Sequence, residues 1–173
     1  MKQIILDTID STNEYAKRIA KDVDENILII ANSQTNGRGT HGRNWYSEEG
    51  KNILMSFFIK DINDYKSIDG ITIEIGRIIH EILSSKFDLN FEIKLPNDIL
   101  CNGKKICGIL CESSIINDKV NYLIIGIGLN VNQTNFNDDI KDIATSLKKE
   151  LGADINKDDI IESISESILK LFY

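Results

Sequence analysis

The chain has 173 residues, of which 42% are hydrophobic and 27% charged, and its formal net charge is −7 at pH 7. These values are typical of one soluble globular domain with a sizeable core, so a single domain is expected over residues 1–173. The acidic balance disfavours a polyanionic partner such as DNA, and the sequence has neither the apolar run of a signal peptide nor one of membrane-spanning length, which predicts a cytoplasmic protein.

Hydrophobic periodicity predicts a mixture of short strands and amphipathic helices along the chain. Strands are expected at 3–7, 27–31, 52–60, 91–94, 98–101, 104–113 and 119–131, and helices at 12–21, 68–86, 140–150 and 157–171. The first helix opens on a capping box, with Ser11 at the N-cap and Glu14 three residues later. Asn102-Gly103 between two apolar stretches predicts a hairpin. The pattern predicts an α+β fold, with a mixed, largely antiparallel sheet and helices packed mainly on one side.

Residues 34–45 (Gln-Thr-Asn-Gly-Arg-Gly-Thr-His-Gly-Arg-Asn-Trp) have neither helical nor strand periodicity. Glycine lets the backbone approach a ligand closely, and successive N–H groups in such a loop can bind an anion. Arginine adds a fork suited to phosphate or carboxylate. A loop that binds a small anionic ligand is therefore predicted, with a charged turn that only connects two strands as the alternative.

Other polar segments lie at the ends of predicted elements: Ser11-Thr12-Asn13, Lys94-Leu-Pro-Asn-Asp98, Lys104-Lys-Ile-Cys-Gly-Ile-Leu-Cys-Glu112 and Gly126-Ile-Gly-Leu-Asn-Val-Asn132. Helix capping, turn formation and surface charge are the structural alternatives for them. Glycine inside a strand, as at 108, 126 and 128, indicates that something approaches the backbone closely. A dinucleotide fingerprint is rejected, because the third glycine and the following helix are missing. The three cysteines (101, 107 and 111) form no CxxC pair, which favours reduced thiols and disfavours a zinc site.

Taken in order, the motifs STN, QxxGRGxxGRxW, KxPND, KxxGILxE and GxGxN resemble the catalytic domain of biotin–protein ligases over residues 11–132. The resemblance implies the fold of class II aminoacyl-tRNA synthetases and biotin ligases. It also implies ATP-dependent attachment of biotin to a carrier lysine through biotinyl-5′-adenylate. ATP with Mg²⁺ and biotin would be substrates, and no tightly bound cofactor is expected. The implied partner is the biotin carrier domain of a carboxylase, not nucleic acid or a membrane, and homodimerisation through a sheet edge stays open.

The resemblance also assigns roles to individual residues, and it assigns none as a metal ligand. Catalytic roles fall on Arg38, Lys94 and Lys105. Biotin contacts fall on Ser11, Thr12, Asn13, Gln34, Gly37, Arg38, Gly39, Thr40, Lys105, Gly108 and Gly126. ATP or adenylate contacts fall on Arg38, Arg43, Trp45, Lys94, Asn97 and Asn130. Asp98 is a candidate helper for deprotonating the carrier lysine.

The chain departs from the resembled pattern at several places. Thr40 and His41 stand where the loop of the family often reads GRGRxGR, and the lost cation is expected to loosen retention of the adenylate. Leu95 replaces a tryptophan, which should alter packing only. The N-terminal DNA-binding domain and the small C-terminal β-barrel of some relatives are expected to be absent. Alternatives for function are lipoate or octanoate transfer, a non-catalytic biotin-binding module, and a structural partner of a carboxylase complex.

Overall fold

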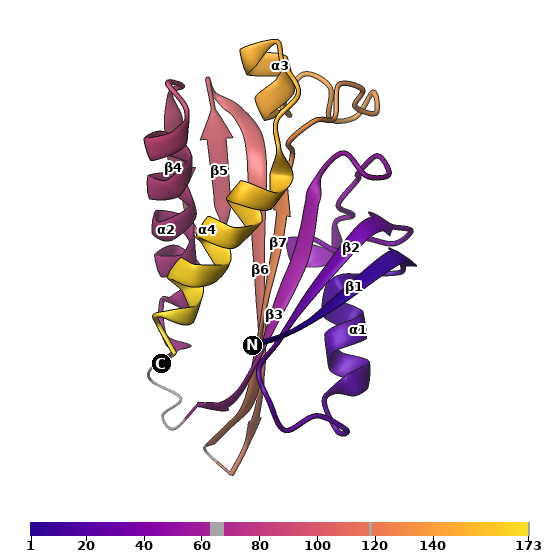
Figure 1. Ribbon diagram of the computed structural model, residues 1–173, viewed down its shortest axis with the longest axis vertical. Helices are drawn as coiled ribbons and strands as arrows, with labels where there is room; N and C mark the ends of the chain where they lie inside the picture. Colours follow the sequence, from indigo (N-terminus) through magenta and orange to yellow (C-terminus); the bar gives the residue numbers. More distant parts are fainter. Residues whose placement is uncertain (63–67, 118, 173) are drawn as a thin grey trace.

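The computed structural model describes residues 1–62, 68–117 and 119–172, and within these ranges seven strands form one sheet. The strands are β1 (Lys2–Ile9), β2 (Ile27–Gln34), β3 (Ile53–Ile62), β4 (Phe91–Lys94), β5 (Asp98–Cys101), β6 (Lys104–Ile116) and β7 (Lys119–Leu129). Their order across the sheet is β1-β2-β3-β7-β6-β5-β4 (Figure 1). β1 pairs with β2 in parallel, whereas the other neighbouring strands of this sheet pair antiparallel. The predicted mixed, largely antiparallel sheet is confirmed.

Helices cover both faces of the sheet unequally. They are α1 (Thr12–Ile19), α2 (Ile71–Lys86), α3 (Leu147–Leu151) and α4 (Lys157–Leu169). Figure 1 shows α2 and α4 together on one side, and α1 beside the strands at the other end of the sheet. The expectation that helices pack mainly on one side is confirmed, with α1 on the opposite face.

The alternation of side chains along the central strands builds a core on each face. On β3, Phe57 faces α2 and α4, and its neighbour Phe58 faces α1; both are fully buried. On β2, Leu28 belongs to the first core and Ile29 to the second. A strand that is covered on both faces reads as a continuous apolar run, and each such side chain contributes about 1.5–3 kcal/mol through burial. The central strands therefore form a rigid platform.

The predicted elements are confirmed within a few residues, with two corrections. The helix expected at 140–150 is wrong, because residues 138–143 form turns and α3 covers only Leu147–Leu151. Here Lys105 N–H donates to the Ile143 carbonyl (2.8 Å) and Thr145 N–H donates to the Lys105 carbonyl (2.9 Å), which holds the segment against β6 instead. No helix within the described ranges is long and apolar enough to cross a bilayer.

The second correction concerns the capping box at the start of α1. Ser11 stands at the N-cap position, as predicted, with φ −155° and ψ 138°, but its hydroxyl makes no capping hydrogen bond. Its N–H donates to Asp10 Oδ1 at 2.8 Å, and the Glu14 carboxylate binds Lys17 and Arg38. The side chains at this helix start are thus directed to other partners, next to the site described below.

Candidate active site

Three glycines form a shallow floor on the α1 face of the sheet. Gly108 on β6 pairs directly with Gly128 on β7, and Gly126 lies two residues earlier on the same strand. A Cβ built on Gly128 would lie 2.5 Å from Cε2 of Trp45, and one on Gly108 would lie 2.8 Å from Cζ3 of the same ring. A Cβ on Gly126 would lie 2.3 Å from Asn13 Oδ1. Something does approach these glycines closely, as predicted, and it is these two side chains.

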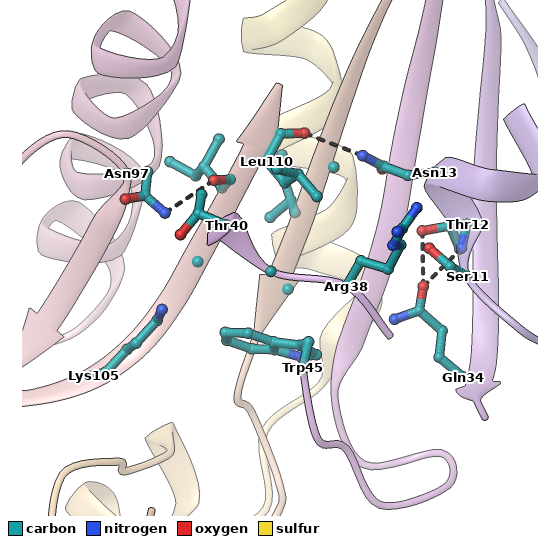
Figure 2. Close-up of a pocket in the computed structure, with 16 residues that line it drawn as sticks. Ser11, Thr12, Asn13, Gln34, Arg38, Thr40, Trp45, Asn97, Lys105 and Leu110 are labelled. Atoms are coloured by element: carbon teal, nitrogen blue, oxygen red, sulfur yellow. Dashed lines mark hydrogen bonds between the residues drawn. The ribbon is translucent and has the colours of Figure 1, made fainter. Parts of the chain in front are cut away.

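A pocket opens above this floor, with about 430 Å³ of space, part of it open to solvent. Predicted site residues from α1, β2, β6, β7 and two loops meet in its wall (Figure 2). These are Ser11, Thr12, Asn13, Gln34, Arg38, Gly39, Thr40, Trp45, Asn97, Lys105, Gly108 and Gly126. Residues that lie far apart in the sequence, from Ser11 to Gly126, therefore build one site.

Hydroxyl and amide groups form a buried polar corner at one end of this pocket. Thr12 donates from its N–H and its Oγ1 to Gln34 Oε1, at 2.7 and 3.1 Å. Ser56 Oγ lies 2.7 Å from Thr12 Oγ1 and 2.6 Å from Asn13 Oδ1. Because Gln34 Oε1 is occupied by Thr12, its Nε2 is the end that faces the pocket in Figure 2. Such a corner suits a small uncharged heterocycle that offers both donors and acceptors.

Ser56 is a member of this corner that the sequence reasoning missed. It is fully buried in the middle of β3, between Met55 and Phe57. A lone serine inside an apolar run is the signal that could have identified it, since a buried hydroxyl needs a hydrogen-bond partner.

Cations stand on both sides of Trp45, with Lys105 on one and Arg38 on the other (Figure 2). Lys105 Nζ lies 2.7 Å from Asp98 Oδ1 and 5.4 Å from the centroid of the Trp45 ring. Arg38 Nη1 pairs with the carboxylate of Glu14. Asn97 lies beside them, and its Nδ2 donates to the Ile109 carbonyl at 3.3 Å. Both cations line the first pocket, and Lys105 is the one that lies beside the tryptophan ring.

A second pocket shares Gly39, Thr40, Trp45 and Lys105 with the first and continues toward the 140–144 segment. Its apolar wall consists of Ile140, Ile143 and Ala144, opposite Trp45 and Tyr46. Arg43, Asn44 and Asn130 complete the lining. An aromatic ring faced by aliphatic side chains suits a planar base, and the four shared residues join this space to the first pocket.

The polar residues of this second pocket are partly engaged already. Arg43 donates from Nη2 to Thr40 Oγ1 at 3.1 Å and from Nε to the Thr40 carbonyl at 3.3 Å. Asn130 is buried, its Nδ2 donates to the Thr145 carbonyl at 3.0 Å, and its Oδ1 accepts from Asn52 Nδ2 at 3.3 Å. The Nδ2 and the Oδ1 of Asn130 can each form one more hydrogen bond.

Two predicted site residues, Lys94 and Gly37, line neither pocket. Lys94 is exposed at the end of β4 and lines neither pocket, because the Pro96 turn directs the chain back and leaves Lys94 at the sheet edge. Gly37 is buried beneath the loop, where its carbonyl accepts from Trp45 N–H at 2.8 Å and a Cβ would lie 2.5 Å from the Trp45 oxygen. Gly37 therefore closes the loop instead of lining the pocket.

Asn13 lines the first pocket, but its amide group is largely engaged within the protein. Its Nδ2 donates to the Leu110 carbonyl at 3.2 Å and to Glu112 Oε2 at 2.9 Å, and its Oδ1 lies against Ser56 Oγ. Both amide hydrogens are therefore used within the protein, and the amide orientation is fixed. Asn13 ties the start of α1 to β3 and β6, and only a remaining lone pair of Oδ1 is left for a ligand.

The three cysteines are free thiols, and Cys101 and Cys107 are buried. Burial raises the pKa of the Cys107 thiol to about 12, so this side chain stays neutral in the core. Within residues 1–62, 68–117 and 119–172, no three His, Cys, Asp or Glu side chains are arranged to hold a metal ion.

Comparisons with known proteins agree with this geometry. Residues 5–130 match the model of the biotin/lipoate A/B protein ligase family. The bifunctional ligase/repressor BirA of Bacillus spizizenii is 38% identical over 164 residues, which are 93% of this chain and 50% of the relative. The biotin–[acetyl-CoA-carboxylase] ligase of Paracoccus denitrificans is 30% identical over 124 residues, 70% of this chain and 51% of the relative. This chain thus spans about half the length of these curated relatives.

Solved structures show the same relationship at the level of the fold. A biotin protein ligase from Aquifex aeolicus, in complex with biotin and ATP, superposes with a TM-score of 0.80 at 31% identity, covering 98% of this chain and 69% of that one. The ligase from Leishmania major in complex with biotinyl-5-AMP superposes with a TM-score of 0.74 at 26% identity, covering 94% and 71%. The sequence match and the shared architecture together show that this chain belongs to the biotin/lipoate A/B protein ligase family.

Proposed function

We propose that this chain attaches biotin to a lysine of a biotin carrier domain, with ATP as the energy source and biotinyl-5′-adenylate as the intermediate. The observation that carries the proposal is the junction of two pockets at Lys105, Thr40 and Trp45. One pocket ends in a corner of neutral donors and acceptors, and the other offers an aromatic ring and aliphatic side chains. A ligand of the first pocket and a ligand of the second would meet beside Lys105.

The polar corner favours biotin over lipoate within this family. The ureido ring of biotin carries donors and an acceptor, which Thr12, Gln34 and Ser11 can match. The dithiolane ring of lipoate offers no comparable groups, so it would leave Gln34 Nε2 and the Ser11 hydroxyl, which bind no other group of the described residues, without a partner in the ligand. A site built to hydrogen-bond a polar ligand can reject an analogue that lacks those groups by about 10⁴-fold or more.

The first step needs no nucleophile from the protein. The biotin carboxylate attacks the α-phosphorus of ATP, a new P–O bond forms, and pyrophosphate leaves with the electrons of the broken bond. Negative charge grows on the phosphoryl oxygens, where Lys105 and Arg38 stand on opposite sides of Trp45. Catalysis is then mainly positioning and electrostatic stabilisation by these preorganised cations. Lys94 lines neither pocket, and its contact with the ATP phosphates stays a prediction.

ATP would enter as its Mg²⁺ complex. Mg²⁺ commonly keeps several waters and takes one or two carboxylates plus substrate phosphates. The part of the chain that the structure describes offers no three-residue metal cage, so most ligands would come from the phosphates and water.

In the second step the amine of the carrier lysine attacks the acyl carbon of the adenylate, and AMP leaves. Asp98 stays a candidate acceptor for the proton of that amine; its buried Oδ1 pairs with Lys105 Nζ at 2.7 Å, and it lines neither pocket. We place the reaction in the cytoplasm, with reduced Cys101, Cys107 and Cys111. Strands β1 and β4, the two edges of the sheet, are where a homodimer would form.

The test is transfer of labelled biotin to a purified carrier domain, with ATP, Mg²⁺ and excess lipoate as competitor. We expect transfer that lipoate does not reduce. Adenylate formation without transfer would limit the activity of this chain to the first step. A complete lack of pyrophosphate release would favour a non-catalytic biotin-binding module and refute the proposal.

A further inference from the structure

A chain of alternating charges connects the polar corner with the glycine-rich loop. Asn13 Nδ2 donates to Glu112 Oε2 at 2.9 Å, and the other oxygen of Glu112 lies 2.7 Å from Lys17 Nζ. Lys17 Nζ also lies 2.8 Å from Glu14 Oε1, and the same oxygen pairs with Arg38 Nη1. The fixed amide of Asn13 is thus linked, through three ion pairs, to the arginine of the loop.

The members of this chain differ in how firmly the fold holds them. Asn13, Glu14 and Lys17 stand on α1, and Glu112 stands on β6. The side chains of Lys17, Glu14 and Glu112 are about 30% exposed, whereas that of Arg38 is 48% exposed and extends from a loop. The hydrogen bond from Lys17, followed by that from Arg38, holds the pKa of Glu14 below its ordinary value. Glu14 is therefore ionised and held in place, and it pairs with Arg38, whose long side chain has many rotamers.

Arginine has one of the largest rotamer freedoms of any side chain, and that freedom must be lost when it binds an anion. Glu14 occupies Nη1 of Arg38, which leaves Nε and Nη2 of the planar guanidinium for a second acceptor. In Figure 2 this guanidinium lies over the pocket, close to Thr12 and Asn13. The ordering cost is thereby met by the protein before a ligand arrives.

We propose that Glu14, held in place by Lys17 and Glu112, is a positioning residue that fixes Arg38 so that its remaining donors meet the carboxylate of the substrate. The proposal rests on the proposed function for the identity of that substrate. It gives Glu14 an effect that depends on the charge of the ligand, which a purely structural role in α1 would not have.

The test compares biotin with biotinamide, the neutral amide of the same skeleton, by calorimetric titration of the wild-type chain and Glu14→Ala. We expect the variant to bind biotin roughly 5- to 10-fold more weakly and to bind biotinamide within about twofold of wild type. Glu81→Ala, which removes an exposed glutamate of α2, is the matched control for net charge and should change neither affinity.

Each other result overturns the proposal. Tighter binding of biotin by Glu14→Ala would mean that Glu14 competes with the substrate for Arg38. Equal weakening of both ligands would mean a structural role in α1, and two unchanged affinities would mean no role. If the wild-type chain binds neither ligand, the proposed function fails, and a measurement without ligand still decides the role of Glu14.

That measurement is ¹⁵N relaxation of the Arg38 Nε–H group in the unliganded protein. We expect a rigid signal in the wild type and a clear loss of order in both Glu14→Ala and Lys17→Met, since either change breaks the chain of ion pairs. The double variant should be no more mobile than Glu14→Ala alone, because both act through one partner. An Arg38 signal of the same mobility in all variants would refute the positioning role.

Discussion

Gly128→Ala should damage the nucleotide pocket and leave the polar corner intact. The new methyl group would lie 2.5 Å from Cε2 and 2.8 Å from Nε1 of Trp45. Carbon atoms in contact are usually about 3.5–4.0 Å apart, so the ring must move by about 1 Å or more. The loop can allow this movement, whereas β7, paired on both sides with β3 and β6, cannot.

The magnitude follows from the cost of forcing extra volume into a packed contact. Such overpacking typically costs about 1–3 kcal/mol, and each 1.4 kcal/mol is tenfold in a binding constant. If the displaced Trp45 no longer forms its side of the base pocket, ATP affinity should fall roughly 5- to 150-fold. Biotin affinity should change by less than about threefold, because Thr12 and Gln34 lie away from the ring.

The assay can observe the displaced side chain directly, because Trp45 is the only tryptophan of the sequence. Intrinsic fluorescence therefore reports the position of this ring, and titration with ATP and with biotin gives the two affinities separately. ATP-dependent pyrophosphate release at saturating biotin then measures the KM for ATP. We expect a changed emission spectrum and a raised KM.

Two other glycines provide the comparisons. Gly126→Ala would place its methyl group 2.3 Å from Asn13 Oδ1, whose amide is fixed by three partners, so it should weaken biotin binding instead. Gly76→Ala in α2 would meet only Ile109 Cδ1, at 3.6 Å, and should leave both affinities unchanged and stabilise the helix by about 0.5–1 kcal/mol. Equal losses of ATP and biotin affinity in Gly128→Ala, or an unchanged KM for ATP, would refute the reasoning.

Three further changes test the charged groups. Lys105→Ala should reduce pyrophosphate release from biotin and ATP by about 10²-fold, and near-normal release would rule out its role. Thr40→Arg restores a cation at the junction of the pockets and should slow dissociation of the adenylate severalfold in a trapping assay; an unchanged rate would show that the cation is not what retains it. Arg18 holds the pKa of Asp10 at about 2, so the carboxylate stabilises the fold above its unfolded pKa, and that contribution is lost as pH falls toward 2. Asp10→Asn should cost less than about 1 kcal/mol at pH 7, since the pair is half exposed, and urea unfolding should show the difference shrinking between pH 4 and 2.

Local chemistry made parts of this fold predictable from the sequence. Asn102 and Gly103 have φ of 49° and 80°, the left-handed pair that a two-residue hairpin turn requires. The glycines of β6 and β7 were identified as places of close approach for an equally local reason, because a strand rarely has glycine where a side chain could pack. What approaches them was beyond the sequence pattern, since Trp45 lies more than sixty residues from Gly108 along the chain.

The errors arose where distant backbone decides the structure. Residues 138–143 have helical periodicity, yet pairing of Lys105 with Ala144 places them against β6. The position of Lys94 is likewise set by the strand geometry, which leaves it at the sheet edge, and its predicted contact with phosphate stays untested. The pairing of Glu14 with Arg38 has no local signal at all, because the two residues come from a helix and from a loop that only the fold brings together.

In this site, the groups suited to a neutral ligand lie on buried secondary structure, and the groups suited to an anion lie on an exposed loop. Thr12 and Ser56 are buried and tied to the sheet and α1, whereas Arg38 and Arg43 are exposed on the loop. A change in the buried corner must therefore disturb packing as well as binding, because it leaves a polar group unpaired in the interior. A change in the loop removes charge from an exposed segment and leaves the sheet as it was. Loss of stability should consequently accompany loss of biotin affinity in corner variants, and loop variants should lose nucleotide chemistry at nearly unchanged stability.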